Sequence, residues 1–175
     1  MKKYLLALAC VCVASPALAH VTANPDTGTA GKYFATSFRV SHGCEGSDTV
    51  ALTIKLPAGT VILKPQHKAG WTVSTKKSKL DKPVSIGHGK TADEQFDEVT
   101  WRGGPLSDGE YDDFGLLLKL PEVPQTLWFP ITQECVKGAN DWTGIPKDGQ
   151  EWHDLPMPAP FVKVTPAAAG AGHHH

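Results

Sequence analysis

Apolar residues in this chain alternate with polar ones, and this period of two constrains the fold more than any other feature. In residues 49–56 every second side chain is apolar, namely Val50, Leu52, Ile54 and Leu56. Such alternation places one face of a strand on a core and the other face in solvent. No stretch of ten or more residues carries apolar positions at helical spacing without interruption by Gly, Pro or β-branched residues. The pattern therefore predicts strands and argues against a helical domain.

Further short strands are predicted at roughly even spacing, with Gly and Pro between them. They cover Tyr33–Ser41, Val61–Pro65, Trp71–Thr75, Glu98–Arg102, Tyr111–Leu120, Thr126–Glu134 and Phe161–Val164. Strands of this kind favour a sandwich over a parallel α/β sheet. We therefore predict an all-β, immunoglobulin-like β-sandwich with a single domain. The polar stretch Thr75–Phe96 is predicted to be a long mobile hairpin, and Gly138–Pro160 to have little regular structure.

Residues 1–19 have the parts of a secretory signal. Lys2 and Lys3 precede an apolar run, and Ala17 and Ala19 give the small-residue cleavage pattern. The apolar run is too short to span a bilayer. We expect cleavage after Ala19, a domain over residues 20–165, and a disordered tail over residues 166–175. The tail ends in His173, His174 and His175, which are either native or an expression tag.

The net charge limits the kinds of partner that the protein can bind, and the cysteine content indicates the compartment in which it works. The formal net charge is −1 and no basic amphipathic run is present, which argues against nucleic acid and anionic membranes as partners. Cys10 and Cys12 lie in the signal, so an exported protein would keep only Cys44 and Cys135. One pair in an oxidising compartment predicts a disulfide. The alternative, a thiolate copper site, lacks a Cys-x-x-Cys arrangement.

Cleavage after Ala19 would make His20 the first residue of the mature protein. Its α-amine and its imidazole Nδ1 could then close a chelate ring on one metal ion. Two neutral nitrogens in a tetragonal arrangement suit Cu(II), the strongest binder among the divalent ions. The amine has an ordinary pKa of about 8, so the metal must displace a proton and the affinity should fall in acid. The alternative is that a histidine follows the cleavage site by chance.

Other histidines are weaker candidates. His42 is favoured because it lies at a strand end, two residues before Cys44, where Gly43 and the expected disulfide would hold the loop still. Glu45 is the carboxylate nearest to that loop. His153 precedes Asp154, which could orient its ring, whereas His67 and His88 are expected to be solvated. Trp142 and Trp152 lie in the irregular segment, and Trp152 is interpreted as a cover on the open end of the sandwich.

Several short motifs together resemble a known family. In order they are His20-Val21-Thr22-x-x-Pro25, Ala30-Gly31-x-Tyr33, Arg39-Val40-x-His42-Gly43-Cys44, Lys64-Pro65 with Gly70-Trp71, Tyr111-Asp112-x-Phe114, Trp142, and His153-Asp154-Leu155 with Pro158-Ala159-Pro160. Their order and spacing over nearly the whole mature chain are similar to those of the YcnI-like copper-binding domain family, in a Gram-negative type with the His-Gly-Cys motif.

The resemblance implies an exported all-β domain that binds Cu(II) in a single-histidine brace. His20 matches the brace histidine and Trp142 matches a tryptophan beside the ion. The Gram-positive pattern has a Glu shortly after the strand that here ends at Val40, and this chain has Ser41-His42-Gly43 at that place. Either His42 substitutes for the carboxylate or Glu45 serves instead. The family often carries a membrane anchor, and the lack of an apolar tail here implies a free periplasmic form.

Three functions compete on this basis. The first is a periplasmic Cu(II)-binding protein, a chaperone or buffer in copper homeostasis without catalysis, whose partners would be other periplasmic or inner-membrane copper-handling proteins. The second is a copper-dependent oxidative enzyme of the polysaccharide monooxygenase type, which would pair His20 with a second histidine such as His42. The third is an interaction sandwich that binds no metal.

Overall fold

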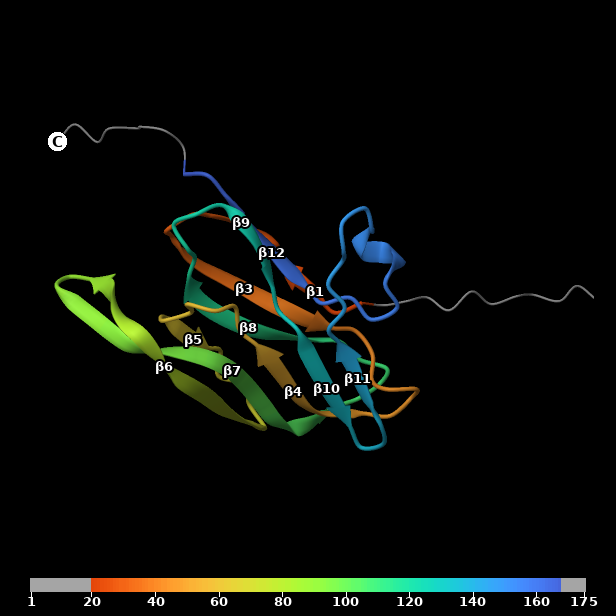
Figure 1. Ribbon diagram of the computed structural model, residues 1–175. Helices are drawn as coiled ribbons and strands as arrows, with labels where there is room; N and C mark the ends of the chain where they lie inside the picture. Colours follow the sequence, from red (N-terminus) through yellow and green to blue (C-terminus); the bar gives the residue numbers. More distant parts are fainter. Residues whose placement is uncertain (1–19, 168–175) are drawn as a thin grey trace, which may run out of the picture.

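The regular structure of the described residues consists of strands and one short 3₁₀ turn, which confirms the all-β prediction (Figure 1). The computed structural model describes residues 20–167; the predicted signal, and the predicted tail from residue 168 on, lie outside them. The strands are β1 (Thr22–Asn24), β2 (Thr27–Thr29), β3 (Tyr33–Val40), β4 (Thr49–Lys55), β5 (Leu63–Pro65), β6 (Trp71–Gly87), β7 (Lys90–Leu106), β8 (Asp112–Lys119), β9 (Gln125–Trp128), β10 (Ile131–Cys135), β11 (Ala139–Trp142) and β12 (Phe161–Thr165). A 3₁₀ turn, η1 (Trp152–Asp154), precedes β12.

The strands form three sheets around a common core. The largest has the order β11-β10-β4-β7-β6, and the second has the order β1-β3-β8-β5. A smaller sheet, β2-β12-β9, includes one parallel pair, β2 with β12. In Figure 1 the strands of the second sheet cross those of the largest, with β9 and β12 at the upper end of the sandwich.

The predicted alternation explains which side chains fill the core. Leu52 and Ile54 of β4 are fully buried, as are Leu116 and Leu118 of β8. Aromatic rings pack between the sheets, and Trp101 lies 5.6 Å from Phe114, centroid to centroid. Burial of such large apolar side chains is the main favourable term in folding.

One predicted strand is two strands in the structure. The sequence analysis predicted a single strand over Thr126–Glu134, but the chain leaves the small sheet after β9 and enters the large sheet at β10. Phe129 and Pro130 separate the two, and Phe129 is completely buried. Pro130 has no N–H to give to a ladder; its carbonyl instead accepts a hydrogen bond of 2.8 Å from Lys55 N. The prediction was wrong here because both halves have the same period.

The polar stretch Thr75–Phe96 is the end of a long hairpin, as predicted, but its strands continue much further than the sequence pattern indicated. β6 and β7 pair from Trp71 with Gly103 to Gly87 with Lys90. The hairpin projects beyond the sandwich on the left of Figure 1. Its outer half is exposed and held partly by polar contacts such as the Lys77–Glu94 ion pair at 3.5 Å. The outer parts of β6 and β7 bury neither face. Their sequences therefore do not alternate between apolar and polar residues, and the strands could not be predicted there.

A disulfide joins Cys44 and Cys135, as predicted from the sequence. Both cysteines are buried. The bond ties the loop after β3 to the end of β10 across a sequence separation of 91 residues. Within residues 20–167 no helix is both long enough and apolar enough to cross a membrane.

Candidate metal centre

His20 lies at the edge of the sandwich and is held there by its neighbours in the chain. Val21 is only 2% exposed and belongs to the core. The next residues form β1, which pairs antiparallel with β3. His20 is therefore bonded directly to a core residue, and its backbone has a defined place.

The His20 ring lies among three other rings. Measured between centroids, Trp152 is at 5.0 Å, Trp142 at 6.4 Å and His153 at 6.5 Å. The Nε2 atom of His20 is buried and has no hydrogen-bond partner among the described residues. Buried polar atoms are normally paired, so an unpaired imidazole nitrogen calls for an explanation.

Burial lowers the pKa of His20, and the nearby charge of His153 lowers it further. Both effects favour the neutral imidazole. A neutral imidazole has one nitrogen lone pair, which is the form that binds metals.

Trp142 forms a rigid wall of the site because its polar end is fixed in the interior. It is 3% exposed at the end of β11. Its Nε1 donates to Oε1 of Gln133 at 3.0 Å. Nε2 of Gln133 in turn donates to the His42 carbonyl at 2.7 Å and to Thr49 Oγ1 at 2.8 Å. Each hydrogen-bonding partner fixes the next, so the indole has little freedom to turn.

Trp152 and His153 reach His20 from a loop that is closed at its base. Gly144 N donates to the Met157 carbonyl at 2.9 Å, and Ala159 N donates to the Gly144 carbonyl at 2.8 Å. The Ala159 carbonyl accepts a bond of 2.8 Å from Trp152 Nε1. Gly144 suits this base because a Cβ there would lie only 3.1 Å from the Met157 carbonyl oxygen. The loop thus holds η1 over the first described residue.

Trp152, interpreted from the sequence as a cover on the open end of the sandwich, has its ring 5.0 Å from that of His20, centroid to centroid. His153 was singled out by sequence only for its neighbour Asp154, yet no hydrogen bond or ion pair joins these two side chains, both of which the structure describes.

A cavity of about 200 Å³ beside His153 is lined by Thr22, Asp26, Trp152, His153 and Phe161. Asp26 is therefore the carboxylate at this cavity, and no sequence motif indicated it.

His42 lies on the other side of Trp142. Its ring is 6.0 Å from the indole, and its Nδ1 donates to the Gly43 carbonyl at 2.6 Å. That bond fixes the tautomer, so a neutral ring carries its lone pair on Nε2. His20 and His42 thus contact the same tryptophan.

Glu45 lies away from these rings. It occupies an exposed turn between Cys44 and Ser47 and has a positive φ of 50°. The concavity beside it is lined by Val136, Lys137 and Gly138 at the turn before β11, and by no residue of the His20 surroundings. Trp142 is at the far end of β11, roughly 13 Å away at the usual rise of a strand. The structure does not bring Glu45 and His20 together.

Side chains alone do not complete a metal site. Among the residues from 20 to 167, no three His, Cys, Asp or Glu side chains gather so that they could hold an ion. His67 and His88 are exposed, as expected, and His88 lies in the β6–β7 turn. A metal at His20 would therefore need a main-chain donor as well, and the α-amine that cleavage would create is such a donor.

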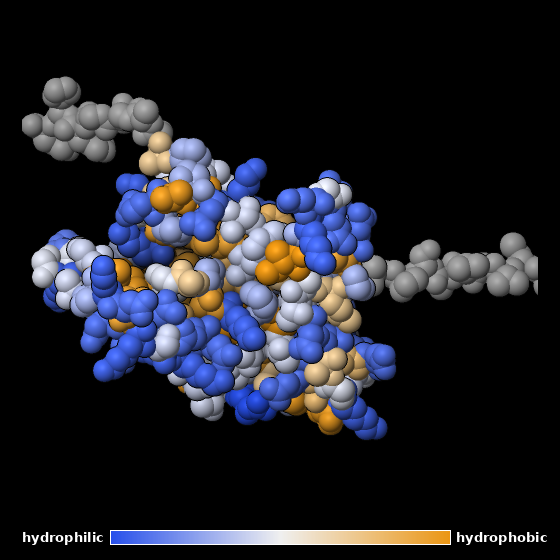
Figure 2. Space-filling model, in the orientation of Figure 1, coloured by the Kyte–Doolittle hydropathy of each residue, from blue (hydrophilic) through white to orange (hydrophobic). Residues whose placement is uncertain are grey.

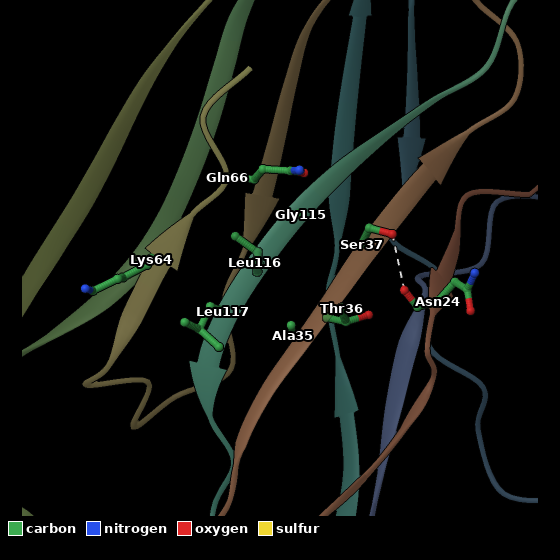
Figure 3. A pocket seen from close by; sticks show the side chains of 9 residues that line it. All are labelled: Asn24, Ala35, Thr36, Ser37, Lys64, Gln66, Gly115, Leu116 and Leu117. Atoms are coloured by element: carbon green, nitrogen blue, oxygen red, sulfur yellow. Dashed lines mark hydrogen bonds between the residues drawn. The ribbon is translucent and has the colours of Figure 1, made fainter. Parts of the chain in front are cut away.

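A second hollow, of about 450 Å³, lies on the outer face of the β1-β3-β8-β5 sheet (Figure 3). Small residues form its floor, including Ala35, Ser37 and Gly115, and Ser37 Oγ donates to the Asn24 carbonyl at 3.2 Å. Figure 3 shows the Lys64 side chain pointing away from this floor. None of its lining residues is a His, Cys, Asp or Glu, so the hollow is not a candidate metal site. The face seen in Figure 2 is mostly hydrophilic with small separate apolar patches.

Solved structures resemble this fold. The crystal structure of an uncharacterised protein from Nocardia farcinica, described as an immunoglobulin-like fold, is 25% identical with a TM-score of 0.61, over 83% of this chain and 97% of that one. This match confirms the predicted immunoglobulin-like sandwich. A cohesin module of a family 33 glycoside hydrolase from Clostridium perfringens is 10% identical with a TM-score of 0.46, over 81% and 92% of the two chains.

The family follows from a comparison with family models. Among curated proteins, none matches the chain significantly. A model described as "Domain of unknown function (DUF1775)" matches residues 20–164, which is most of the chain. The protein therefore belongs to this family, the YcnI-like family that its motifs resemble.

Proposed function

We propose that this protein is an exported, periplasmic Cu(II)-binding protein that carries or buffers the ion at His20. The observation that carries the proposal is the His20 ring, which lies beside two tryptophans and whose pKa is lowered by burial, so that the imidazole is neutral. Copper is here the cargo, and the partners would be other copper-handling proteins of the periplasm or the inner membrane. The family resemblance and the predicted cleavage before His20 both favour this reading.

The protonation of His20 is suited to a chelate. A chelate with the α-amine requires the lone pair on Nδ1, because Nδ1 is close enough to the main chain and Nε2 is not. We therefore place the proton on Nε2 and the lone pair on Nδ1. Nδ1 is the nitrogen closer to the main chain and can share an ion with the α-amine. The lowered pKa of His20 keeps this form available at neutral pH.

The chelate supplies affinity that side chains in this region do not. No trio of ligating side chains surrounds His20 among the described residues, so the amine would be the second donor. The indoles of Trp142 and Trp152 would shield one side of the ion from water. A shielded site on a rigid wall favours retention of the ion over exchange with solvent.

The test compares two versions of the protein that differ at the chain start. One begins at His20 and the other has one glycine before it, and both end at residue 167 so that the terminal histidines do not bind copper. We expect the glycine-extended version to bind Cu(II) by orders of magnitude more weakly, because the amine leaves the chelate while the imidazole stays. Mass spectrometry confirms each start, and a competition titration measures the affinity. Equal affinities would contradict the proposal.

An oxidative copper enzyme is the second candidate, and one observation favours it. A second histidine, His153, lies near His20, and such enzymes pair a chain-terminal histidine with another. Incubation of the copper-loaded protein with a polysaccharide, a reductant and oxygen distinguishes the two functions. Oxidised oligosaccharides in the mass spectrum would favour the enzyme, and their absence with full copper loading would favour the carrier.

A further inference from the structure

We propose that His153 is a second imidazole ligand of the ion bound at His20, so that η1 closes the site from the side opposite to the core. This inference rests on the proposed function of His20. It differs from the single-histidine brace that the resemblance implies, and from both sequence-based candidates for the remaining ligand, His42 and Glu45.

The distance between the two rings fits a shared ion. A metal–imidazole bond is about 2.0–2.1 Å, so two rings that bind one ion have centroids roughly 4.5 to 6.5 Å apart, from a right angle to a straight angle at the metal. The centroids of His20 and His153 are 6.5 Å apart. This separation is at the upper end of the range, where the two rings lie on nearly opposite sides of the ion. Such an arrangement suits the tetragonal geometry of Cu(II).

Trp152 prepares both rings for this arrangement. Its indole lies 5.0 Å from His20 and 4.8 Å from His153, centroid to centroid. Its Nε1 donates to the Ala159 carbonyl, and its ring lies 5.8 Å from that of Phe161 in an edge arrangement. One fixed indole thus positions two imidazoles from segments more than a hundred residues apart. Rigid support of this kind is what a ligand set needs to keep its geometry.

The alternatives fit less well. Glu45 lies near the opposite end of β11, so it would require a large rearrangement of the chain. His42 contacts Trp142 from the loop that leads to the disulfide, and its carbonyl is bound by the buried Gln133. His153, by contrast, lies on a short turn with its ring 6.5 Å from that of His20, centroid to centroid.

The resulting site has three nitrogen donors in this chain. They are the α-amine and Nδ1 of His20 and one ring nitrogen of His153. The two imidazoles together with the amine explain why three ligating side chains are not needed. Asp26 lines the adjacent cavity and is placed to interact with the outer part of the His153 ring or with a bound water.

The experiment counts imidazoles on bound copper. Protein that starts at His20 and ends at residue 167 is loaded with one equivalent of Cu(II) and studied by pulsed EPR, which detects the remote nitrogen of each coordinated imidazole. Four variants are compared: His153→Ala, His42→Ala, His67→Ala and His20→Ala. His67 is the matched control because it is an exposed histidine on a loop after β5.

We expect two imidazoles in the parent protein and in His67→Ala, and one in His153→Ala. The affinity of His153→Ala for Cu(II) should fall by at least about tenfold. Loss of a residue that merely hydrogen-bonds to a metal ligand already lowers metal affinity about 10- to 100-fold. Thermal unfolding without copper should be unchanged in His153→Ala, which separates lost ligation from lost folding.

Three results would overturn the inference. They are a single imidazole in the parent protein, an unchanged spectrum in His153→Ala, or a loss of the second imidazole in His42→Ala. Failure of the proposed function has a different signature. In that case the parent protein would bind copper no more tightly than His20→Ala does, whichever histidine is replaced.

Discussion

The indole Nε1 of Trp142 donates a hydrogen bond of 3.0 Å to Oε1 of Gln133, and this bond connects the candidate metal centre to the polar part of the core. Gln133 is fully buried. Its amide also reaches the His42 carbonyl and Thr49 Oγ1. The wall beside His20 is therefore fixed by a glutamine whose polar atoms are paired on both sides.

Replacing Gln133 by Met should destabilise the protein by about 2 kcal/mol, because the change keeps the volume but leaves the Trp142 N–H and the His42 carbonyl without partners in the interior. Urea unfolding followed by circular dichroism measures the free energy of unfolding. Gln125→Met is the control, since Gln125 is exposed on β9, and it should change the stability by less than about 0.5 kcal/mol. A neutral Gln133→Met would mean that water reaches these groups.

Copper bound at His20 should quench tryptophan fluorescence mainly through Trp152. The sequence analysis named Trp142 as the tryptophan beside the ion, but the Trp152 ring is closer to His20, at 5.0 Å against 6.4 Å. A paramagnetic ion quenches nearby indoles efficiently, so Trp152→Phe should remove the larger share of the copper-dependent change. The quenching should be partial, because the chain has five tryptophans, and it should saturate at one copper per chain.

Trp71→Phe is the control for this fluorescence experiment. Trp71 begins β6, which lies four strand positions from β11 in the same sheet, or roughly 19 Å at the usual spacing between strands. Its replacement should lower the total fluorescence and leave the copper-dependent part nearly intact. A larger loss of the copper-dependent change in Trp142→Phe than in Trp152→Phe would place the ion on the Trp142 side of His20.

Reduction of the Cys44–Cys135 disulfide should lower the stability strongly. The bond closes a loop with a sequence separation of 91 residues, and the chain-entropy model assigns about 4 to 5 kcal/mol to a loop of this length. Thermal unfolding with and without a reductant measures the effect. A Cys44→Ala, Cys135→Ala double variant should be destabilised to a similar extent and should be insensitive to the reductant. Two free thiols in the unfolded, unreduced protein would contradict the bond.

Acid should weaken the contact between β3 and β8. Nε and Nη2 of Arg39 each donate to a carboxylate oxygen of Asp113 at 2.9 Å. The hydrogen bond from Arg39 lowers the pKa of Asp113, and the charges of Arg39 and Lys68 lower it further against the opposing effect of burial. The pKa of Asp113 is lower in the folded state than in the unfolded state. The stability that the Arg39–Asp113 pair contributes is therefore fully present above the ordinary carboxyl pKa of about 4. It is lost as the pH falls through the folded-state pKa.

Asp113→Asn should therefore lose a little stability at pH 7 and should show a smaller decline in stability between pH 5 and the acid limit than the parent protein. Urea midpoints over this range measure the difference. Glu122→Gln is the control, because Glu122 pairs with Lys119 on the surface with a side chain that is 75% exposed, and such pairs contribute little. Parallel pH curves for Asp113→Asn and the parent protein would show that the Arg39 pair does not contribute to acid sensitivity.

The class of fold and several of its elements follow from the amino-acid sequence alone. The alternation of Val50, Leu52 and Ile54 sufficed to predict β4. In the structure Leu52 and Ile54 are fully buried, but Thr49 and Ala51 of the opposite face are buried as well. The disulfide was predictable because only two cysteines follow the expected cleavage site. Short strands such as β1 and β11 were missed because three or four residues at a sheet edge do not show a period, and the Phe129-Pro130 break was missed because the period continues on both sides of it.

The surroundings of His20, in contrast, depend on how the sheets and loops pack. The sequence singled out His20 as a candidate because the expected cleavage places it at a chain start, which is a local property. It could not choose between His42, Glu45 and His153, since all three lie far from His20 in the chain. Pairing of β1 with β3, the Gln133 bond to Trp142 and the closed loop that carries η1 bring Trp142, Trp152 and His153 to one place. The reason is physical: spacing along a chain fixes which face of a strand a residue occupies, whereas the meeting of separate segments depends on how the sheets pack.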